Sequence, residues 1–164
     1  MQKLKKWIAP FVLVAAGVAH AQASDFAGPY AGIKFGVDFS HATGVYSGDK
    51  TVPFLGLLGG YNWDVNNFVV GAEVFGDFHN QAATKKDGGI DAKVGIPFNH
   101  VMPYARLGIT TFWPNTRLHY GLGVEYKFAK NFSVAGEWTA DTANTDGTKR
   151  SNNSLTIGLH YYFF

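Results

Sequence analysis

Apolar and polar residues alternate with a period of two over most of the chain beyond residue 30. In the first such stretch, Ile33 and Phe35 alternate with Lys34 and Gly36. Strict alternation predicts a β-strand whose two faces meet different surroundings, because successive side chains of a strand point to opposite sides. Eight stretches show this pattern, and they comprise residues 31–40, 55–63, 68–78, 90–98, 104–110, 118–128, 132–139 and 155–163.

The number and spacing of these strands predict a closed barrel. An even number of strands, each near the ~9–11 residues that cross a bilayer at a tilt, is typical of membrane barrels. The connections alternate in length, with short ones at residues 64–67, 99–101 and 129–131 and longer polar ones at 42–51, 79–89, 114–117 and 140–153. We therefore predict an all-β fold, an eight-stranded antiparallel up-and-down transmembrane barrel of the outer membrane, with both chain ends in the periplasm.

A soluble sandwich or a lipocalin-like barrel would show the same alternation, but with its apolar face turned inward. The polar face of this chain carries many glycines together with charges of both signs, which suits the narrow interior of an eight-stranded barrel. Aromatic residues such as Tyr61, Trp63 and Phe128 stand at the ends of apolar stretches, as in the aromatic girdles of membrane barrels. Both observations favour a barrel whose apolar residues face lipid.

The charged residues of the polar face are expected to fill the barrel interior. An isolated charge in a low-dielectric interior costs much free energy, so we expect cations and anions to pair there. The expected members of this lumen polar network are Lys34, Asp38, Glu73, Asp77, Asp91, Lys93, Arg106, Glu125, Lys127 and Glu137. We interpret this network as a structural plug, which fills the barrel and fixes the strand register. The alternative is a narrow porin-like channel whose ion pairs open to pass ions or small solutes.

The N-terminal residues have the three-part pattern of a secretory signal peptide. Three lysines within the first six residues precede an apolar run over residues 7–19, and small residues follow at Ala21 and Ala23. The run is shorter than the ~20 residues of a membrane-spanning helix. We therefore predict a signal peptide over residues 1–23, cleaved after Ala21 or Ala23, and a barrel domain over residues 24–164. The formal net charge of +2 depends on those three lysines, so it gives no argument for nucleic-acid binding.

The end of the chain resembles the last strand of outer-membrane barrels, whose terminal aromatic residues are an assembly signal. The residues that match this signal are Tyr161, Phe163 and Phe164. The stretches 28–36 and 58–73 are similar to the first strand and the second hairpin of the opacity-protein and OmpA-type eight-stranded barrels. This resemblance covers the whole mature chain. It implies the fold but no single activity, since that family includes adhesins, structural anchors, complement-evasion proteins and small channels.

Basic residues of the long connections form a second candidate site, where lipopolysaccharide phosphates could accept charge-assisted hydrogen bonds. Its members are Lys50, Lys85, Lys86, Arg117, Lys149 and Arg150. Acidic neighbours such as Asp49 and Asp87 leave ordinary solvated charge as the alternative. The expected partners are outer-membrane lipid and lipopolysaccharide, the outer-membrane barrel assembly machinery and host surface molecules. We expect a monomer that binds no nucleic acid.

Residue types that would carry catalysis or metal binding are sparse. The chain has no Cys, which excludes disulfides, thiolate metal sites and a Cys nucleophile. Ser40 and His41 are adjacent, so on a strand they point to opposite faces and cannot form one catalytic pair. His100 and His119 are isolated and predict no metal site. We therefore expect no enzyme and no cofactor, but a structural or adhesin-like surface protein that acts through its extracellular loops. The narrow channel is the alternative, and a lipid A-modifying enzyme is less favoured.

Overall fold

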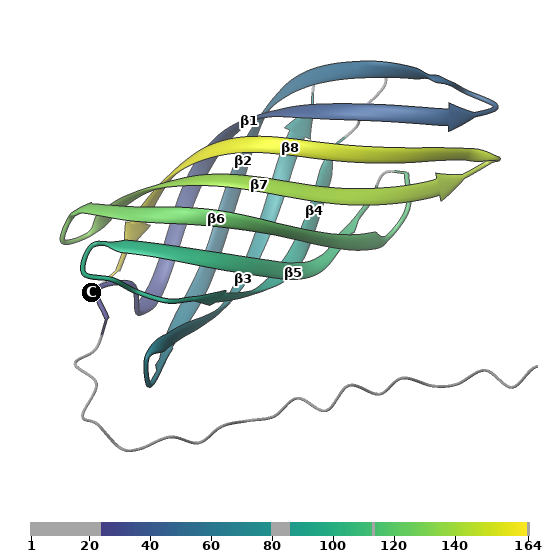
Figure 1. The fold of residues 1–164 in the computed structure, drawn as a ribbon. Coiled ribbons are helices and arrows are strands. Elements are labelled where there is room, and N and C mark those ends of the chain that lie inside the picture. Colours follow the sequence, from purple (N-terminus) through teal and green to yellow (C-terminus); the bar gives the residue numbers. More distant parts are fainter. Residues whose placement is uncertain (1–23, 80–85, 113, 164) are drawn as a thin grey trace, which may run out of the picture.

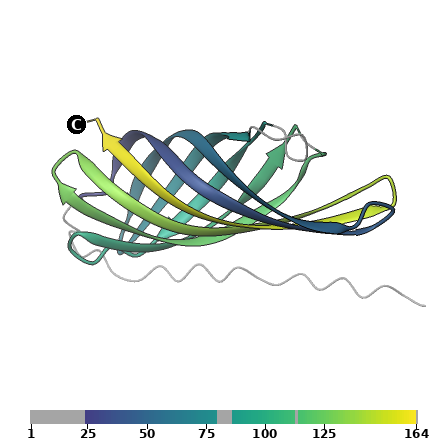
Figure 2. The ribbon, with the colours of Figure 1, turned by 90° about the horizontal axis from the view of Figure 1, so that it is seen from above.

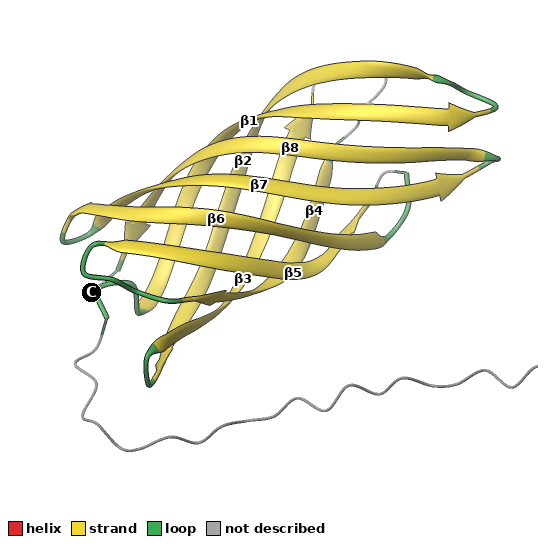
Figure 3. Cartoon of the chain, in the orientation of Figure 1, coloured by secondary structure: helices red, strands yellow, loops and turns green. Residues whose placement is uncertain are grey.

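The computed structural model describes residues 24–79, 86–112 and 114–163, and this part of the chain forms one antiparallel sheet. Its strands are β1 (Gly28–Gly44), β2 (Gly48–Val65), β3 (Phe68–His79), β4 (Asp87–Gly95), β5 (Val101–Thr111), β6 (Arg117–Ala129), β7 (Phe132–Thr145) and β8 (Thr148–Tyr162). Each strand pairs with its neighbours in chain order, and β8 also pairs with β1, so the sheet closes into a barrel (Figures 1 and 3). The predicted eight-stranded antiparallel barrel is confirmed. No helix within the described residues is long and apolar enough to cross a membrane.

One end of the barrel, here called the terminal end, holds the short turns and the closure between the first and last strands. The closure begins where Tyr30 pairs with Tyr162, and the amide of Phe163 donates to the carbonyl of Pro29 at 2.9 Å. Asn66 and Asn99 adopt left-handed backbone conformations in two of the turns, with φ angles of 57° and 53°. Asparagine tolerates this region better than most residues, which explains its place in these turns.

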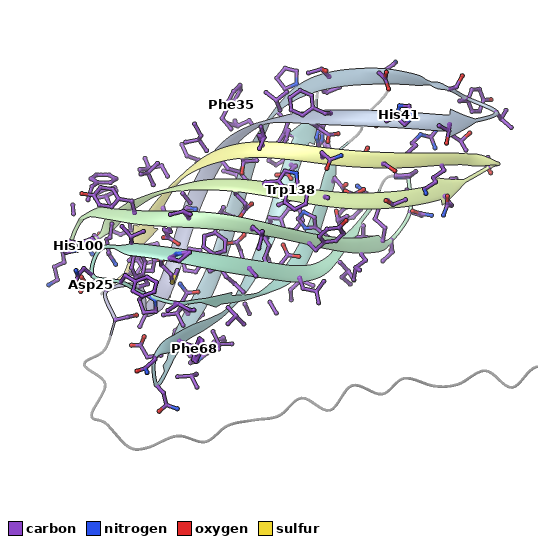
Figure 4. All side chains as sticks on the ribbon, viewed as in Figure 1. Asp25, Phe35, His41, Phe68, His100 and Trp138 are labelled. Atoms are coloured by element: carbon purple, nitrogen blue, oxygen red, sulfur yellow. The ribbon has the colours of Figure 1, made fainter. Side chains whose placement is uncertain are left out.

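The outer wall of the barrel is apolar and exposed, whereas the interior is polar. On the outside, Phe35 is 58% exposed, Leu122 is 60% exposed and Ile157 is 67% exposed. Figure 4 shows Phe35 and Phe68 pointing away from the barrel wall. A protein surrounded by water does not leave a continuous apolar wall of this size uncovered. The alternation therefore has the orientation of a barrel that stands in lipid, with its apolar residues outward.

A short segment before β1 closes the terminal end from inside. Phe26 is completely buried, where it joins a cluster that includes Tyr30, Val69, Met102 and Tyr162. The side-chain amide of Asn62 donates to the carbonyl of Phe26 at 2.9 Å. The segment over residues 24–27 therefore belongs to the folded barrel, and we call it the N-terminal plug.

Two of the predicted long loops are in fact continuations of the strands. Residues 42–51 and 140–153 were expected to be loops, but β1 continues to Gly44, β2 begins at Gly48, β7 continues to Thr145 and β8 begins at Thr148. The ladder between β1 and β8 extends to Gly44 and Thr148. These four adjacent strands therefore run beyond the end of the barrel opposite the terminal end, here called the far end, as the blue, yellow-green and yellow strands in Figures 1 and 2 show.

The remaining boundaries differ by a few residues. β4 ends at Gly95 instead of continuing to Phe98, and Pro97 follows within the connection to β5. Of the predicted connection over residues 79–89, residues 80–85 lie outside the described part of the chain. Arg117, which was expected at the end of a loop, is the first residue of β6.

Candidate functional site

The structure places the ten expected lumen residues inside the barrel. Nine of them are almost fully buried as whole residues, and the side chain of Glu137 is 7% exposed. They come from six of the eight strands and divide into a central cluster, a cluster near the terminal end and a group toward the far end.

Arg106 on β5 is the centre of the network. Its guanidinium group donates to Glu73 at 2.8 Å, to Glu137 at 2.6 Å and, through Nε, to Asp91 at 2.8 Å. Tyr30 and Tyr104 complete the cluster by donating their hydroxyl groups, each at 2.8 Å, to Glu73 and Glu137 respectively. One cation thus holds carboxylates from β3, β4 and β7 together across the full width of the barrel.

Glu125 on β6 is the centre of the cluster near the terminal end. This fully buried carboxylate accepts hydrogen bonds from Ser133 and from the hydroxyl group of Tyr162, the latter at 2.8 Å. His160 lies 3.1 Å from the same oxygen, and the ammonium group of Lys93 lies 3.6 Å from the other. Acceptance of several hydrogen bonds compensates the carboxylate for the water it loses on burial.

Each of the three lumen lysines lies between two aromatic rings. The ammonium group of Lys93 is 4.6 Å from the ring centre of Tyr30 and 5.0 Å from that of Tyr104. Lys34 lies in the same way between Phe54 and Phe75, and Lys127 lies between Phe26 and Tyr162. Cation–π attraction is strongest where water is excluded, so these rings help to stabilise the buried ammonium groups.

Glycines make room for the large lumen side chains. A Cβ atom added to Gly123 would lie 2.4 Å from Cζ of Tyr104, and one added to Gly60 would lie 2.7 Å from the ring of Tyr30. These two tyrosines are the ones that hydrogen-bond the central carboxylates. Glycine at the paired position of the neighbouring strand therefore allows a barrel this narrow to contain both aromatic rings and ion pairs.

Arg117 does not lie in a loop, where the sequence analysis placed it, but at the start of β6. Its side chain is buried in the far mouth of the barrel, where it donates to Asp87 and, at 2.6 Å, to Asp141. Asn152 donates to the same Asp141 at 2.7 Å. The structure thus gives this guanidinium group two carboxylate partners within the barrel mouth.

Sequence reasoning missed this far-mouth cluster, although the alternation contains its signal. Arg117 has the same parity along β6 as Glu125, and Asp141 has the same parity along β7 as Glu137. Both were treated as loop residues because the strands were expected to end sooner. His119 and His160 are two further lumen residues that it did not assign, and they lie beside Asp91 and Glu125.

The other basic candidates lie at the far end on the surface. Lys50, Lys86 and Lys149 are exposed, and Arg150 is half-buried. Lys85 lies outside the described residues. The structure therefore brings these cations to one end of the molecule without joining them into a single cluster.

The four strands beyond the far mouth form a second candidate site, which we call the projecting sheet. It comprises residues 40–44, 48–53, 142–145 and 148–153. The amide of Val45 donates to the carbonyl of Gly147 at 3.3 Å, and the amide of Tyr46 donates to the hydroxyl group of Thr148 at 3.2 Å. The two hairpin tips are therefore hydrogen-bonded to each other and form a single end.

The two faces of the projecting sheet carry different groups. On the face that continues the lumen, Ser40 donates to Asn152 at 2.7 Å. On the outer face, His41 is paired with Asp49, and Figure 4 shows His41 on this part of β1. Ser40 and His41 thus point to opposite faces, which is what the alternation predicts. Within the described residues, no group of three His, Asp or Glu side chains is arranged to hold a metal ion.

The aromatic residues of the expected assembly signal lie at the barrel closure. Tyr161 and Phe163 face outward, while Tyr162 between them is completely buried in the lumen. Phe164 lies outside the described residues. Phe163 is therefore in phase with the outward-facing residues of β8. The ring of Tyr161 packs edge-on against the rings of Phe132 and Phe163, at centroid distances of 5.0 Å and 5.1 Å.

Comparison with known proteins supports the fold independently. The model of the family described as outer membrane protein beta-barrel domain matches residues 9–163. No curated protein matches the sequence significantly.

Solved structures of similar shape include natural and designed membrane barrels. Neisserial surface protein A has a TM-score of 0.59 and 18% sequence identity, covering 84% of this chain and 98% of its own. A de novo designed transmembrane β-barrel has a TM-score of 0.51 and 14% identity, covering 87% of this chain and 98% of its own. The attachment invasion locus protein Ail of Yersinia pestis, solved with a heparin analogue, has a TM-score of 0.48 and 19% identity, covering 82% and 99%. At these identities the likeness concerns the fold alone.

Proposed function

Because this chain belongs to the outer membrane protein beta-barrel domain family, whose members lie in the outer membrane, we propose that it is a non-enzymatic surface protein that acts through its projecting sheet. We propose that residues 1–23 direct its export and that the terminal end faces the periplasm. The projecting sheet then stands outside the cell. The barrel is the anchor, and the sheet is the part that meets host surface molecules.

The observation that carries this proposal is the exposed tip of the projecting sheet, where the two hairpins are hydrogen-bonded to each other. Val45 is 72% exposed and Tyr46 is 65% exposed, although neither faces the lipid-contacting wall of the barrel. Exposed tyrosines are common anchors of protein interfaces, because a large ring is buried there at little cost in conformational entropy. A tip fixed by its own backbone bonds also loses little entropy on binding.

The lumen supports an anchoring role over a channel. Arg106 and its three carboxylate partners occupy the centre of the barrel, and all four side chains are at least nine-tenths buried. Passage of ions would require this cluster to separate, which would leave several charges unpaired in a low-dielectric interior. We therefore propose that the network is a structural plug.

The tip should be tested by replacing its two exposed residues. We expect the double variant Val45→Ser/Tyr46→Ser to reduce adhesion of expressing bacteria to host epithelial cells by about tenfold or more, because loss of a central anchor costs more than about 1.4 kcal/mol. Adherent bacteria would be counted for strains that express the wild type or the variant, with a non-adherent strain that lacks the gene as the baseline. The variant should reach the outer membrane in normal amounts.

Phe112 offers a matched control, since it is 78% exposed and lies in the connection between β5 and β6, which is not part of the projecting sheet. Phe112→Ser should leave adhesion unchanged. If the tip variant adheres as well as the wild type, or if both variants lose adhesion equally, the assignment to the tip is wrong.

We also propose that the exposed lysines of the far end contact lipopolysaccharide phosphates. Replacement of Lys50, Lys86 and Lys149 by alanine should lower the unfolding midpoint in micelles that contain lipopolysaccharide, because charge-assisted hydrogen bonds to phosphate are lost. The same variant should match the wild type in phosphocholine micelles. Equal midpoints in both kinds of micelle would show that these lysines are solvated surface charge.

A further inference from the structure

The N-terminal plug carries an interaction that concerns how the precursor is processed. Ser24 is bonded twice to Asp64, which follows Trp63 near the end of β2. The backbone nitrogen of Ser24 donates to one carboxylate oxygen of Asp64 at 2.8 Å, and its hydroxyl group donates to the other at 2.6 Å. Both oxygens of one carboxylate are thus directed at the first described residue of the chain.

The residues after Ser24 are held in place on every side. The amide of Ala27 donates to the carbonyl of Ser24 at 3.1 Å, which forms a tight turn. Lys127 donates to the carbonyl of Asp25, and Phe26 is completely buried. These contacts with the folded barrel fix the position of the Ser24 nitrogen beside Asp64.

From this geometry we propose that the mature chain begins at Ser24 and that its new α-ammonium group forms an ion pair with Asp64, which holds the N-terminal plug in the barrel. The sequence leaves two cleavage positions open, after Ala21 and after Ala23. Only the second turns the nitrogen that already faces Asp64 into a charged group. Cleavage after Ala21 would leave that nitrogen as a neutral amide.

The chemical step is hydrolysis of the Ala23–Ser24 peptide bond by a signal endopeptidase. The C–N bond breaks, water supplies the oxygen of the new Ala23 carboxylate, and the Ser24 nitrogen leaves as an amine that takes up a proton. An amide has one hydrogen to donate and no charge, whereas the ammonium has three hydrogens and a positive charge. Hydrogen bonds with a charged donor and a charged acceptor are roughly twice as strong as neutral ones.

The surroundings of Ser24 leave room for the ammonium group. Ser24 and Asp25 line an open groove of about 610 Å³ at the terminal end, beside His100 and Lys130. Asp64 is half-buried, so its pair with the ammonium group is partly shielded from water without being fully desolvated. A partly buried pair of this kind keeps more of its stabilisation than an exposed one.

The first test is the N-terminus itself. The protein would be purified from outer membranes, and its intact mass and N-terminal sequence would be determined. We expect a chain that begins Ser24-Asp25-Phe26. A chain that begins at Gln22, or at any other residue, would overturn the proposal.

The second test measures whether the α-ammonium group of Ser24 forms a stabilising ion pair with Asp64. Chains that begin at Ser24 and at Gln22 would each be refolded into detergent micelles, with and without Asp64→Asn. We expect Asp64→Asn to lower the unfolding midpoint by about 2–4 °C more in the chain that begins at Ser24, because only there does it remove an ion pair. Equal decreases in the two chains would overturn the proposed ion pair.

Asp25→Asn is the matched control. Asp25 is the neighbour of Ser24, but its carboxylate lies 3.5 Å from His100 and is well exposed. The same loss of one negative charge should therefore have the same effect in both chains. A larger effect of Asp25→Asn in the chain that begins at Ser24 would mean that Asp64 is not the specific partner, and it would also overturn the ion pair. Both tests are independent of any adhesive role of the projecting sheet.

Discussion

Replacement of Arg106 by alanine is expected to lower the free energy of unfolding of the barrel by about 3–5 kcal/mol. Arg106 supplies hydrogen bonds to Glu73, Asp91 and Glu137, and removal of the guanidinium group leaves these carboxylates facing one another in a dry interior. Breaking a buried pair in this way costs more than the pair contributes to stability, because the remaining charge has no partner. Urea titration of the protein in lipid vesicles, followed by tryptophan fluorescence, would measure the change.

The same cluster provides its own control. Neutralisation of the carboxylates in the Arg106→Ala background, with Glu73→Gln and Glu137→Gln, should restore part of the lost stability. Lys149→Ala, which removes an exposed cation from the projecting sheet, should change the free energy of unfolding by less than about 0.5 kcal/mol. A small effect of Arg106→Ala, combined with a gain of ion conductance in planar bilayers, would favour a lumen that water and ions can enter. That result would count against the structural plug.

A charge on the lipid-facing wall is expected to cost almost as much. Leu122 lies near the middle of β6, where it pairs with Ala105 and Trp138 on the outside of the barrel. Leu122→Arg should lower the free energy of unfolding in vesicles by about 2–4 kcal/mol, because an arginine near the bilayer centre cannot reach water easily. The measurement is again urea titration in vesicles.

Thr43→Arg is the control for this second prediction. Thr43 has the outward parity of β1 but belongs to the projecting sheet, so it should lie beyond the hydrocarbon. Arginine there should cost about 0–1 kcal/mol at most. Equal costs at Leu122 and Thr43, or a mature protein that stays folded and dissolved without detergent or lipid, would contradict the placement of the apolar wall in a membrane.

The barrel could be predicted from the sequence because every second residue of a membrane-spanning strand faces lipid and must be apolar. Along β6, Leu118, Leu122 and Val124 are apolar while Glu125 is charged, so the alternation identifies both the strand and its two faces. The pairing of charges in the lumen also follows from physical reasoning, since no buried charge is stable alone. The choice of partners does not follow, because it depends on strand register and side-chain reach.

The projecting sheet could not be predicted, and the reason is physical. Beyond the membrane both faces of a strand meet water or polar neighbours, so nothing demands an apolar residue at every second position. The tract over residues 42–51 lacks the alternation and was therefore expected to be a loop, yet Ala42 pairs with Gly48 in an unbroken ladder. The misplacement of Arg117 has the same origin. Because β6 was expected to begin one residue later, its first inward-facing residue was assigned to a loop.

At the terminal end, the backbone amide of Phe163 donates to the carbonyl of Pro29, so the start of β1 and the end of β8 lie side by side. The seam between β1 and β8 is a ladder like the other seven, with paired residues along its whole length. The molecule therefore suits circular permutation, with a short linker over this seam and a new opening in the tip between β1 and β2. Such a rearranged chain would retain every strand pair while moving Phe163 away from the chain terminus. It would thus separate the contribution of Phe163 to barrel closure from its proposed role in the assembly signal.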